Sequence, residues 1–284
     1  MNYDSIVYLN GEFLPLGEAR VSVMDRGFLF GDGVYEVVPA FNENIFRLKE
    51  HLSRLRISLS AIGMENPCTD GKWEELLLEL IRKNPPAGNK SIYIQITRGV
   101  GEREHRSTER LKPTVFAMCR PVIARNTDQG VTAITHVDIR WDYCHIKAIS
   151  LLPSVMLKMR AYQRDGSYEA ILLRDGMVTE GAASNVFVVK DDAVLTPVND
   201  NKLLSGITRD LILELLQKHR VEVRETAITE QALRDADEIW ITSSVMEIAP
   251  VIQLDGKPVG AGRPGKMWKK INDWYQEFKA GGEN

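Results

Sequence analysis

Apolar residues recur with the spacing of an α-helix in several segments of the chain, most clearly in residues 47–62. The apolar positions of that segment are Leu48, Leu52, Leu55, Leu59 and Ile62. A recurrence every three or four residues places these side chains on one face, which predicts an amphipathic helix. A second helix is predicted to begin at Asp70, acting as its N-cap, and to end before Pro85. Further helices are predicted at about 151–164, at 207–219 and from about 264.

Other segments have the alternating pattern of β-strands. Two short strands are predicted on either side of Asn10–Gly11, because this dipeptide favours a tight hairpin turn. The stretches "SIYIQITRG" and "TVFAMCR" alternate in the same way. In the second half, strands are predicted at 131–138 and 237–243. Three or four more are predicted between 168 and 197, joined by turns at 174–176 and 191–192.

The order of these elements predicts an α+β protein with two domains. The first, at 1–120, is a small N-terminal α+β domain. The second, at 131–284, is larger and rich in strands. Between them, residues 121–130 ("PVIARNTDQG") combine Pro, Gly and polar residues with little periodicity, which is typical of a linker.

Composition narrows the class of function. The 284 residues are 44% hydrophobic and 26% charged, as expected for a globular protein with one large or two medium cores. Lys and Arg number 36 against 39 Asp and Glu, a balance that favours small-molecule chemistry over nucleic-acid or membrane binding. No apolar run approaches the roughly 20 residues of a membrane span, and the N-terminus lacks the apolar core of a signal peptide.

Cysteine and histidine usage adds two expectations. The three cysteines are odd in number, widely spaced and form no CxxC pair, so a reducing cytoplasmic setting is expected without disulfides. The five histidines are scattered, and no metal site is expected.

One carboxylate stands out in the stretch "VTEGAASNVFVV". Glu180 interrupts an otherwise strand-like run, and the next four residues, Gly-Ala-Ala-Ser, are too small to cover it. The pattern raises the question of what this carboxylate faces.

Two segments offer an anion site, each with a simpler alternative. In "LLSGITRDLILELL" the backbone N–H groups at the helix start suit a phosphate. The alternative is that Ser205 or Thr208 merely caps the helix. Arg54, on the helix at 47–62, is placed to pair with an anion, or else it is an exposed helix arginine.

Lys147 and a charged loop carry the remaining candidate chemistry. Lys147 lies in the mostly apolar stretch "HIKAISLL". A lysine among apolar neighbours loses its proton more readily, as Schiff-base chemistry requires. The alternative is a lysine that buries its carbon chain and extends its amine to solvent, which gives the same pattern. In "RGVGEREH", Arg103 and His105 are two residues apart, so both leave an extended loop on the same side and can clasp one carboxylate. A solvated, charged loop is the alternative.

Taken in order, these segments resemble the class IV (fold-type IV) aminotransferases, which use pyridoxal 5'-phosphate, and most closely the branch that acts on D-amino acids. The resemblance covers nearly the whole chain. It rests on "DRGFLFGDGVYEVV", "EHLSRL", "IQITRGVGEREH", "DIRWDYCHIKAISLL", "YEAILLRDGMVTEGAASNVFVV", "LLSGITRD" and "ITSSVMEIAPVIQLDG".

The resemblance implies a role for each cofactor-binding position. Lys147 would bond to the cofactor's aldehyde and then move the proton between Cα and C4′. Glu180 would face the pyridine nitrogen and keep it protonated. The other implied cofactor contacts are Arg54, Ser184, Leu204, Ile207, Thr208 and Ser244, with Leu204 on the ring face and Ile207 and Thr208 giving their N–H groups to the phosphate.

The resemblance also implies how the substrate is held. Tyr35, Arg103 and His105 would grip its α-carboxylate, with Arg103 and His105 coming from the neighbouring subunit of a homodimer and the active site between the domains. Three departures from the family pattern concern cofactor electronics and side-chain preference. Ala183 replaces a serine, leaving Ser184 as the match, and the segment after Lys147 reads Ala-Ile-Ser in place of Ser-Leu-Asn. Val245 and Met246 stand where hydroxyl residues are frequent.

The expected reaction is transamination between a D-amino acid such as D-alanine and a 2-oxo acid such as 2-oxoglutarate, giving pyruvate and D-glutamate. Alternatives with the same fold are an (R)-selective amine transaminase, a branched-chain L-amino-acid aminotransferase and an aminodeoxychorismate lyase. A noncatalytic protein that binds the cofactor is a more distant alternative.

Overall fold

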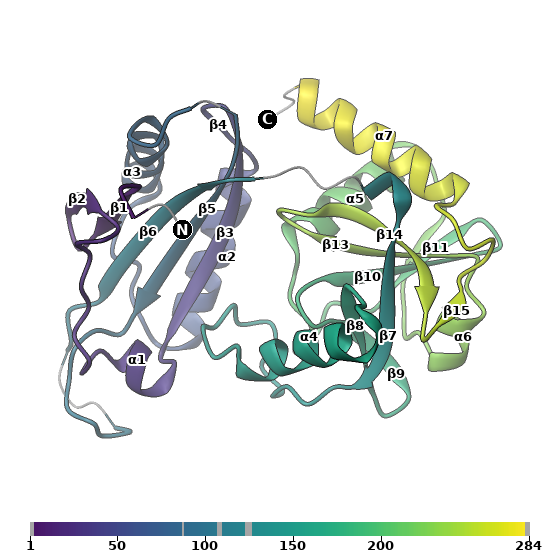
Figure 1. The fold of residues 1–284 in the computed structure, drawn as a ribbon, viewed down its shortest axis with the longest axis horizontal. Coiled ribbons are helices and arrows are strands. Elements are labelled where there is room, and N and C mark those ends of the chain that lie inside the picture. Colours follow the sequence, from purple (N-terminus) through teal and green to yellow (C-terminus); the bar gives the residue numbers. More distant parts are fainter. Residues whose placement is uncertain (1–2, 87, 107–109, 123–126, 282–284) are drawn as a thin grey trace. The chain divides into compact units, whose positions relative to one another are not determined.

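The computed structural model describes residues 3–86, 88–106, 110–122 and 127–281 (Figure 1). The chain forms two compact units. The first comprises Met1–Ile123 together with Ile146–Leu151, and the second comprises Ala124–His145 together with Leu152–Asn284. Part of the expected linker, residues 123–126, lies outside the described residues.

The first unit is an antiparallel sheet of six strands in the order β2-β1-β6-β5-β3-β4. Its strands are β1 (Ile6–Leu9), β2 (Glu12–Pro15), β3 (Gly33–Phe41), β4 (Asn44–Ile45), β5 (Asn89–Thr97) and β6 (Thr114–Pro121). Its helices are α1 (Arg26–Phe30), α2 (Leu48–Ala61) and α3 (Asp70–Arg82). The predicted hairpin is confirmed, with Asn10 and Gly11 both at positive φ.

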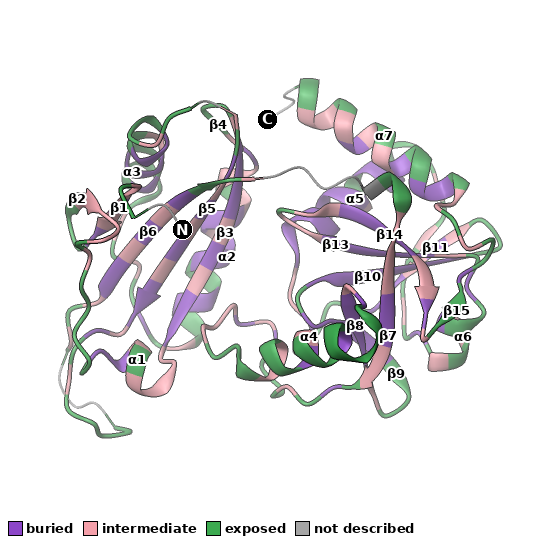
Figure 2. Ribbon diagram, in the orientation of Figure 1, coloured by how far each residue is buried: buried purple, intermediate pink, exposed green. Residues whose placement is uncertain are grey.

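The helices α2 and α3 bury their apolar faces against this sheet. Alternate residues of β5, Ile92, Ile94 and Ile96, are fully buried in the same cluster as Leu55 of α2 and Trp73 of α3. Figure 2 shows the resulting buried positions along β3 and β5. Since side chains alternate across a strand, the residues between these isoleucines point to the opposite face of the sheet.

The N-cap predicted for α3 was one residue late. Thr69 has extended backbone dihedrals, and its side chain accepts a hydrogen bond from Lys72 N, whereas Asp70 is the first helical residue. An acidic residue in the first turn still favours the helix through its interaction with the helix dipole.

Residues 146–149 belong to the first unit because they complete the edge of β3. Strand β4 pairs only with the end of β3, at Ala40 and Phe41. At its other end, Tyr35 N donates to Lys147 O at 2.9 Å and Ile149 N donates to Gly33 O at 3.1 Å. An exposed strand edge has unpaired backbone groups, and this returning segment satisfies them.

The second unit is built on a nine-stranded mixed sheet in the order β12-β11-β10-β13-β14-β7-β8-β9, with β15 paired to β14. Its strands are β7 (Val131–Val137), β8 (Glu169–Arg174), β9 (Met177–Gly181), β10 (Asn185–Lys190), β11 (Ala193–Thr196), β12 (Val223–Glu225), β13 (Glu238–Ser243), β14 (Glu247–Leu254) and β15 (Lys257–Pro258). Its helices are α4 (Leu152–Asp165), α5 (Ile207–Lys218), α6 (Glu230–Arg234) and α7 (Lys266–Gly281), and a 3₁₀ turn spans Thr127–Gln129.

The predicted turns of this unit are confirmed, but the predicted meander is not a run of neighbouring strands. Asp175, Gly176, Asp191 and Asp192 all have positive φ, as tight hairpins require. Strands β9 and β10, however, are consecutive in sequence and far apart in the strand order. Their ends approach each other at the turn between them, where Gly181 N donates to Ser184 O at 2.6 Å.

Candidate active site

Lys147 and Tyr35, which are predicted to bind the cofactor and the substrate carboxylate, lie side by side on the first unit. Besides the backbone bond to Tyr35, Lys147 N donates to Ser58 Oγ at 3.2 Å. Its Nζ lies 4.4 Å from the centroid of the Tyr35 ring. The backbone on both sides of Lys147 is therefore fixed, while its amine lies over an aromatic face.

The ring of Tyr35 is packed beside Tyr93, with 5.7 Å between centroids. The Tyr93 hydroxyl donates to Gln95 Oε1 at 2.7 Å. Burial, with a smaller contribution from Tyr35, raises the pKa of Tyr93 to about 12. Tyr93 thus stays neutral at physiological pH and provides a fixed, uncharged wall for Tyr35.

Arg54 is held by a buried carboxylate. Its Nε and Nη2 donate to Oε1 and Oε2 of Glu36, each at 2.8 Å, and His51 Nδ1 lies 2.9 Å from Glu36 Oε2. Burial opposes ionisation of Glu36, but Arg54 and His51 outweigh it and hold the pKa of Glu36 well below its usual range. The alternative of an exposed helix arginine is wrong, because the Arg54 side chain is only 7% exposed.

Arg103 and His105 lie on an exposed loop and approach the same aromatic ring. The guanidinium carbon of Arg103 is 5.8 Å from the centroid of Phe30, and the His105 ring is 5.5 Å from it. Sequence reasoning missed Arg26, a buried residue that donates to the carbonyls of Glu104 and His105 at 2.6 and 3.2 Å. This contact holds the loop backbone against α1.

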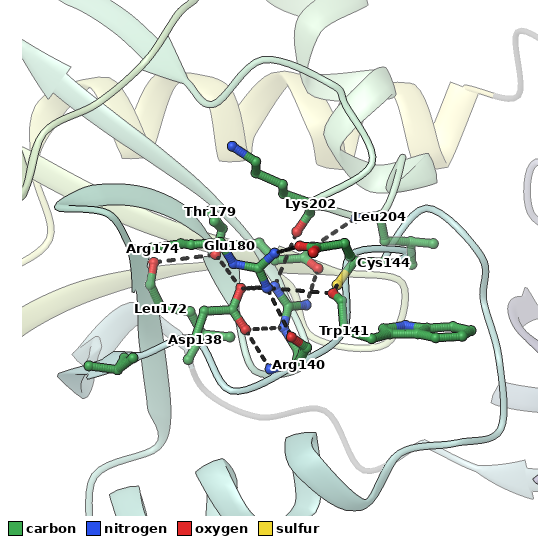
Figure 3. Close-up of polar contacts among 12 residues, drawn as sticks. Asp138, Arg140, Trp141, Cys144, Leu172, Arg174, Thr179, Glu180, Lys202 and Leu204 are labelled. Carbon is green, nitrogen blue, oxygen red and sulfur yellow. Dashed lines mark hydrogen bonds and ion pairs between the residues drawn. The ribbon is translucent and has the colours of Figure 1, made fainter.

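Glu180, the residue before the last of β9 in the second unit, is a buried carboxylate that accepts hydrogen bonds from its surroundings (Figure 3). Oε1 accepts from Nη1 of Arg140. Oε2 accepts from Asn185 Nδ2 and from the backbone N–H of Leu204, both at 3.1 Å. Hydrogen bonds to a carboxylate, one of them from a cation, stabilise its charged form.

Arg140 is itself fixed by Asp138. Its Nε and Nη2 donate to Oδ1 and Oδ2 of Asp138, each at 2.9 Å. Asp138 also accepts from Thr179 Oγ1 at 3.0 Å and pairs with Arg174 at 3.2 Å. Burial opposes ionisation of Asp138, but Arg140 overcomes it and lowers the pKa of Asp138 below its ordinary value. Sequence reasoning assigned no role to Asp138 or Arg140.

The loop before α5 is tied to Glu180 through Asn185. Asn185 Nδ2 donates to Leu204 O at 2.8 Å as well as to Glu180. A Cβ on Gly206 would lie 2.0 Å from Asn185 Oδ1, so only glycine allows this approach. The resemblance implies that the Leu204 side chain lies on the ring face of the cofactor, and this stays a prediction. The Leu204 backbone is bonded to both Glu180 and Asn185.

The N-cap residue of α5 is Gly206, and no side-chain cap hydrogen bond forms from that residue. The alternative in which Ser205 or Thr208 caps the helix stays a prediction. The Ser205 hydroxyl donates to Asp210 Oδ2 at 3.4 Å. The first N–H groups of a helix lack intrahelical partners, so Ile207 and Thr208 retain the N–H geometry that suits a phosphate.

Ser184 and Ser244 differ in their surroundings. Ser184 Oγ donates to the buried Glu169 at 2.9 Å and would lie 2.2 Å from a Cβ on Gly181. The small residue after Glu180 is therefore needed to admit this serine. Ser244 lies half-buried in the turn between β13 and β14. Nearby in β13, Thr242 Oγ1 is buried without a hydrogen-bond partner among the described residues.

Comparison with known proteins identifies the family. The family Amino-transferase class IV matches residues 33–254. A D-alanine aminotransferase of Bacillus licheniformis is 39% identical over 272 residues, covering 95% of each chain. A branched-chain aminotransferase structure from Thermoproteus uzoniensis with norvaline has a TM-score of 0.90 at 27% identity, covering 98% of this chain and 96% of that one.

The branched-chain amino acid aminotransferase of Thermobaculum terrenum, solved in its PLP-containing holo form, is also similar. Its TM-score is 0.88 at 25% identity, covering 98% of this chain and 94% of that one. The family match spans well over half of the sequence, and the chain belongs to the class IV aminotransferases.

Proposed function

We propose that this protein is a pyridoxal 5'-phosphate-dependent transaminase that moves the amino group of a D-amino acid, such as D-alanine, to a 2-oxo acid, such as 2-oxoglutarate. The products are then pyruvate and D-glutamate. The observation that carries the reaction class is Glu180, a buried carboxylate that accepts hydrogen bonds from Arg140, Asn185 and the backbone of Leu204. The choice of a D-amino acid is supported by the D-alanine aminotransferases, which are more similar in sequence than the branched-chain enzymes.

The residues present fit this cofactor. Glu180 is a hydrogen-bond acceptor for a ring N–H, and the start of α5 offers N–H groups to a phosphate. The buried hydroxyl of Thr242, which has no partner among the described residues, lies in the strand that leads to Ser244. When bound, pyridoxal 5'-phosphate supplies an electron-withdrawing ring that stabilises the charge left when Cα loses its proton.

Lys147 is proposed as the residue that carries the cofactor and then moves the proton. Its backbone is fixed on both sides by Tyr35 and Ser58, so its amine swings from a defined point. As a free amine, Nζ would take the proton from Cα of the substrate and return it at C4′. A fixed base within reach of Cα lowers the barrier to this transfer.

Arg54 is proposed to contact the phosphate, and its pairing with Glu36 changes what it contributes. Glu36 already neutralises the guanidinium, so Arg54 brings directed hydrogen bonds more than net positive charge. Ser184 donates to Glu169, so its proposed contribution to the cofactor site is indirect, through the turn that follows Glu180.

Arg103 and His105 are proposed, together with Tyr35, to grip the substrate α-carboxylate. Their loop is exposed on the chain that carries it, which suits residues that serve the site of a neighbouring copy. Helix α4 has many exposed positions (Figure 2), and the apolar side chains among them support a homodimer. They are Leu152, Val155, Met156, Met159 and Tyr162. Such a stripe on a surface helix is typical of a protein–protein contact.

Two features of the described residues bear on the cellular compartment of the protein. None of the described helices has the length and apolar character of a membrane span. All three cysteines are free, and burial raises the pKa of Cys119 and Cys144 to about 11. Unreactive free thiols suit a reducing compartment, and we infer a cytoplasmic enzyme.

Initial rates with D-alanine, L-leucine and (R)-1-phenylethylamine as amino donors test the proposal. The pair Arg103 and His105 favours a donor with an α-carboxylate, so the amine is expected to be the poorest substrate. D-alanine is expected to react fastest. A preference for L-leucine would favour the branched-chain alternative, which the similar solved structures represent.

A further inference from the structure

We propose that Arg140 is a positioning residue that keeps Glu180 ionised, so that the proton shared with the cofactor's ring nitrogen stays on the nitrogen. The inference rests on the proposed function, because it needs a pyridine ring beside Glu180. It concerns a residue whose hydrogen bonds to Asp138, Glu180 and Lys202 all lie within the second unit.

The geometry leaves Arg140 one orientation. Asp138 binds the Nε and Nη2 edge of the guanidinium in a bidentate pair, and Nη2 also donates to Lys202 O at 3.2 Å. The remaining nitrogen, Nη1, is the one that donates to Glu180 (Figure 3). A planar guanidinium fixed at one edge presents its other edge in a defined direction.

Asp138 is fixed in turn from two other sides. Thr179 Oγ1 donates to it from the residue that precedes Glu180. Arg174 pairs with it from the end of β8 and also donates to the Arg140 carbonyl at 3.0 Å. The position of Arg140 therefore does not depend on Glu180, as a preorganised support requires.

Because the cluster is buried, the charge of Arg140 has a strong effect on the ionisation of Glu180. The side chains of Arg140, Glu180 and Asp138 are 9%, 6% and 0% exposed. In such surroundings a carboxylate and a pyridinium tend to exchange their proton and become neutral, because desolvation penalises both charges. A cation bound to one oxygen of the carboxylate lowers the free energy of its charged form. The proton then remains on the ring nitrogen, where it strengthens electron withdrawal.

A purely structural role would predict something different. Arg140 also joins the residues after β7 to the loop at 202–204, so its removal is expected to lower stability in either case. Only the electrostatic role predicts a change in the protonation of the nitrogen. The decisive readout is therefore spectroscopic.

The test is the ¹⁵N chemical shift of ring-labelled pyridoxal 5'-phosphate bound to wild type, Arg140→Gln, Arg140→Lys and Arg174→Gln. Arg174 is the matched control, because it pairs with Asp138 in the same cluster and donates to the backbone of Arg140. Wild type, Arg140→Lys and Arg174→Gln are expected to give a protonated nitrogen. Arg140→Gln is expected to give an unprotonated one. The kcat of Arg140→Gln on D-alanine should fall roughly 10- to 100-fold, the loss that is typical when a group that orients an active-site residue is removed.

A protonated nitrogen in Arg140→Gln would overturn the inference, even if the variant is less stable. If Arg140→Gln does not fold, Arg140→Lys decides, since an unprotonated nitrogen there would show that the positive charge is not what matters. Failure of the proposed function would be visible earlier and separately. It would appear as a wild type that binds no cofactor or does not turn over D-alanine.

Discussion

Each of the two units contains a buried arginine–carboxylate cluster. The group that the cluster supports is an arginine in one unit and a carboxylate in the other. In the first unit, Glu36 is fully buried between β3 and α2 and serves to hold Arg54. In the second, Asp138 holds Arg140, and Arg140 in turn supports the carboxylate Glu180. The same pair of charged groups thus presents a cation in one unit and an anion in the other.

The difference follows from what lies around each carboxylate. Glu36 has Arg54 on both oxygens and His51 on one, deep within the core between sheet and helix. Glu180 lies at the end of a strand, where a loop backbone and an amide complete its donors. A carboxylate in the core is a structural group, whereas one at the end of a strand can meet a ligand.

The largest effect expected is on catalysis, from Glu180→Gln. The amide has nearly the same shape but cannot keep a ring nitrogen protonated, so kcat on D-alanine should fall by roughly 10²- to 10⁴-fold. Stopped-flow rates of the first half-reaction measure it. Glu169→Gln, which alters another buried acid of the same unit, is the control and should retain most of the rate. Equal losses in the two variants would contradict the role given to Glu180.

Glu36→Gln should instead act mainly on stability. It leaves the Arg54 guanidinium buried without its counterion, which is expected to reduce the free energy of unfolding by roughly 3–5 kcal/mol. Urea unfolding of the cofactor-free protein measures it. Arg56→Gln is the comparison, because its pair with Asp70 is exposed and is expected to contribute less than about 1 kcal/mol. A Glu36→Gln protein as stable as wild type would contradict the structural role given to Glu36.

Gly206→Ala tests the link between the α5 loop and Glu180. The added Cβ would meet Asn185 Oδ1 at 2.0 Å and displace the amide that holds both Glu180 and Leu204. Overpacking of this kind is expected to lower stability by about 1–3 kcal/mol and to weaken cofactor binding. Thermal unfolding and equilibrium dialysis measure the two effects. Gly71→Ala, where nothing lies within 4 Å of the added atom, should neither lower stability nor weaken cofactor binding.

The smallest effect expected is the pH dependence due to His51. Burial, opposed by Glu36, lowers the pKa of His51 in the folded protein. Below its ordinary pKa of about 6.5 the unfolded chain therefore binds a proton that the folded protein resists, and stability falls as pH falls. The slope is at most about 1.4 kcal/mol per pH unit.

Urea unfolding between about pH 5 and pH 7.5, the range in which an ordinary histidine titrates, should show this slope in wild type and less of it in His51→Gln. The residues of the second cluster, Asp138, Arg140, Arg174 and Glu180, include no histidine, so Arg174→Gln should keep the wild-type slope in that range. An unchanged slope in His51→Gln would show that another group causes the loss of stability at low pH.

Much of the fold could be predicted from periodicity and turn chemistry. The helices α2, α4, α5 and α7 lie close to their predicted ranges, and Asp191–Asp192 forms the predicted turn. The strands β3 and β14 were missed in the pattern of the chain. Glycines precede the first, and Pro250 interrupts the second, although it pairs opposite Trp240 within the sheet.

The supporting groups of the site could not be predicted in the same way. Arg140 and Glu180 are 40 residues apart, and their contact depends on how the ends of β7 and β9 are brought together in the sheet. Composition likewise gave no sign that residues 146–151 return to the first unit, since that depends on an unpaired strand edge. Spacing along the chain predicts faces of elements, whereas these contacts depend on the register between distant strands.

The most direct test of the central claim is the identity of the lysine that carries the cofactor. Borohydride reduction of the holoenzyme, followed by proteolysis and mass spectrometry, fixes the label on whichever lysine is bonded to the aldehyde. The account predicts a phosphopyridoxyl group on the peptide that contains Lys147 and none elsewhere. A label on another lysine, or no label in a protein that turns over D-alanine, would contradict it.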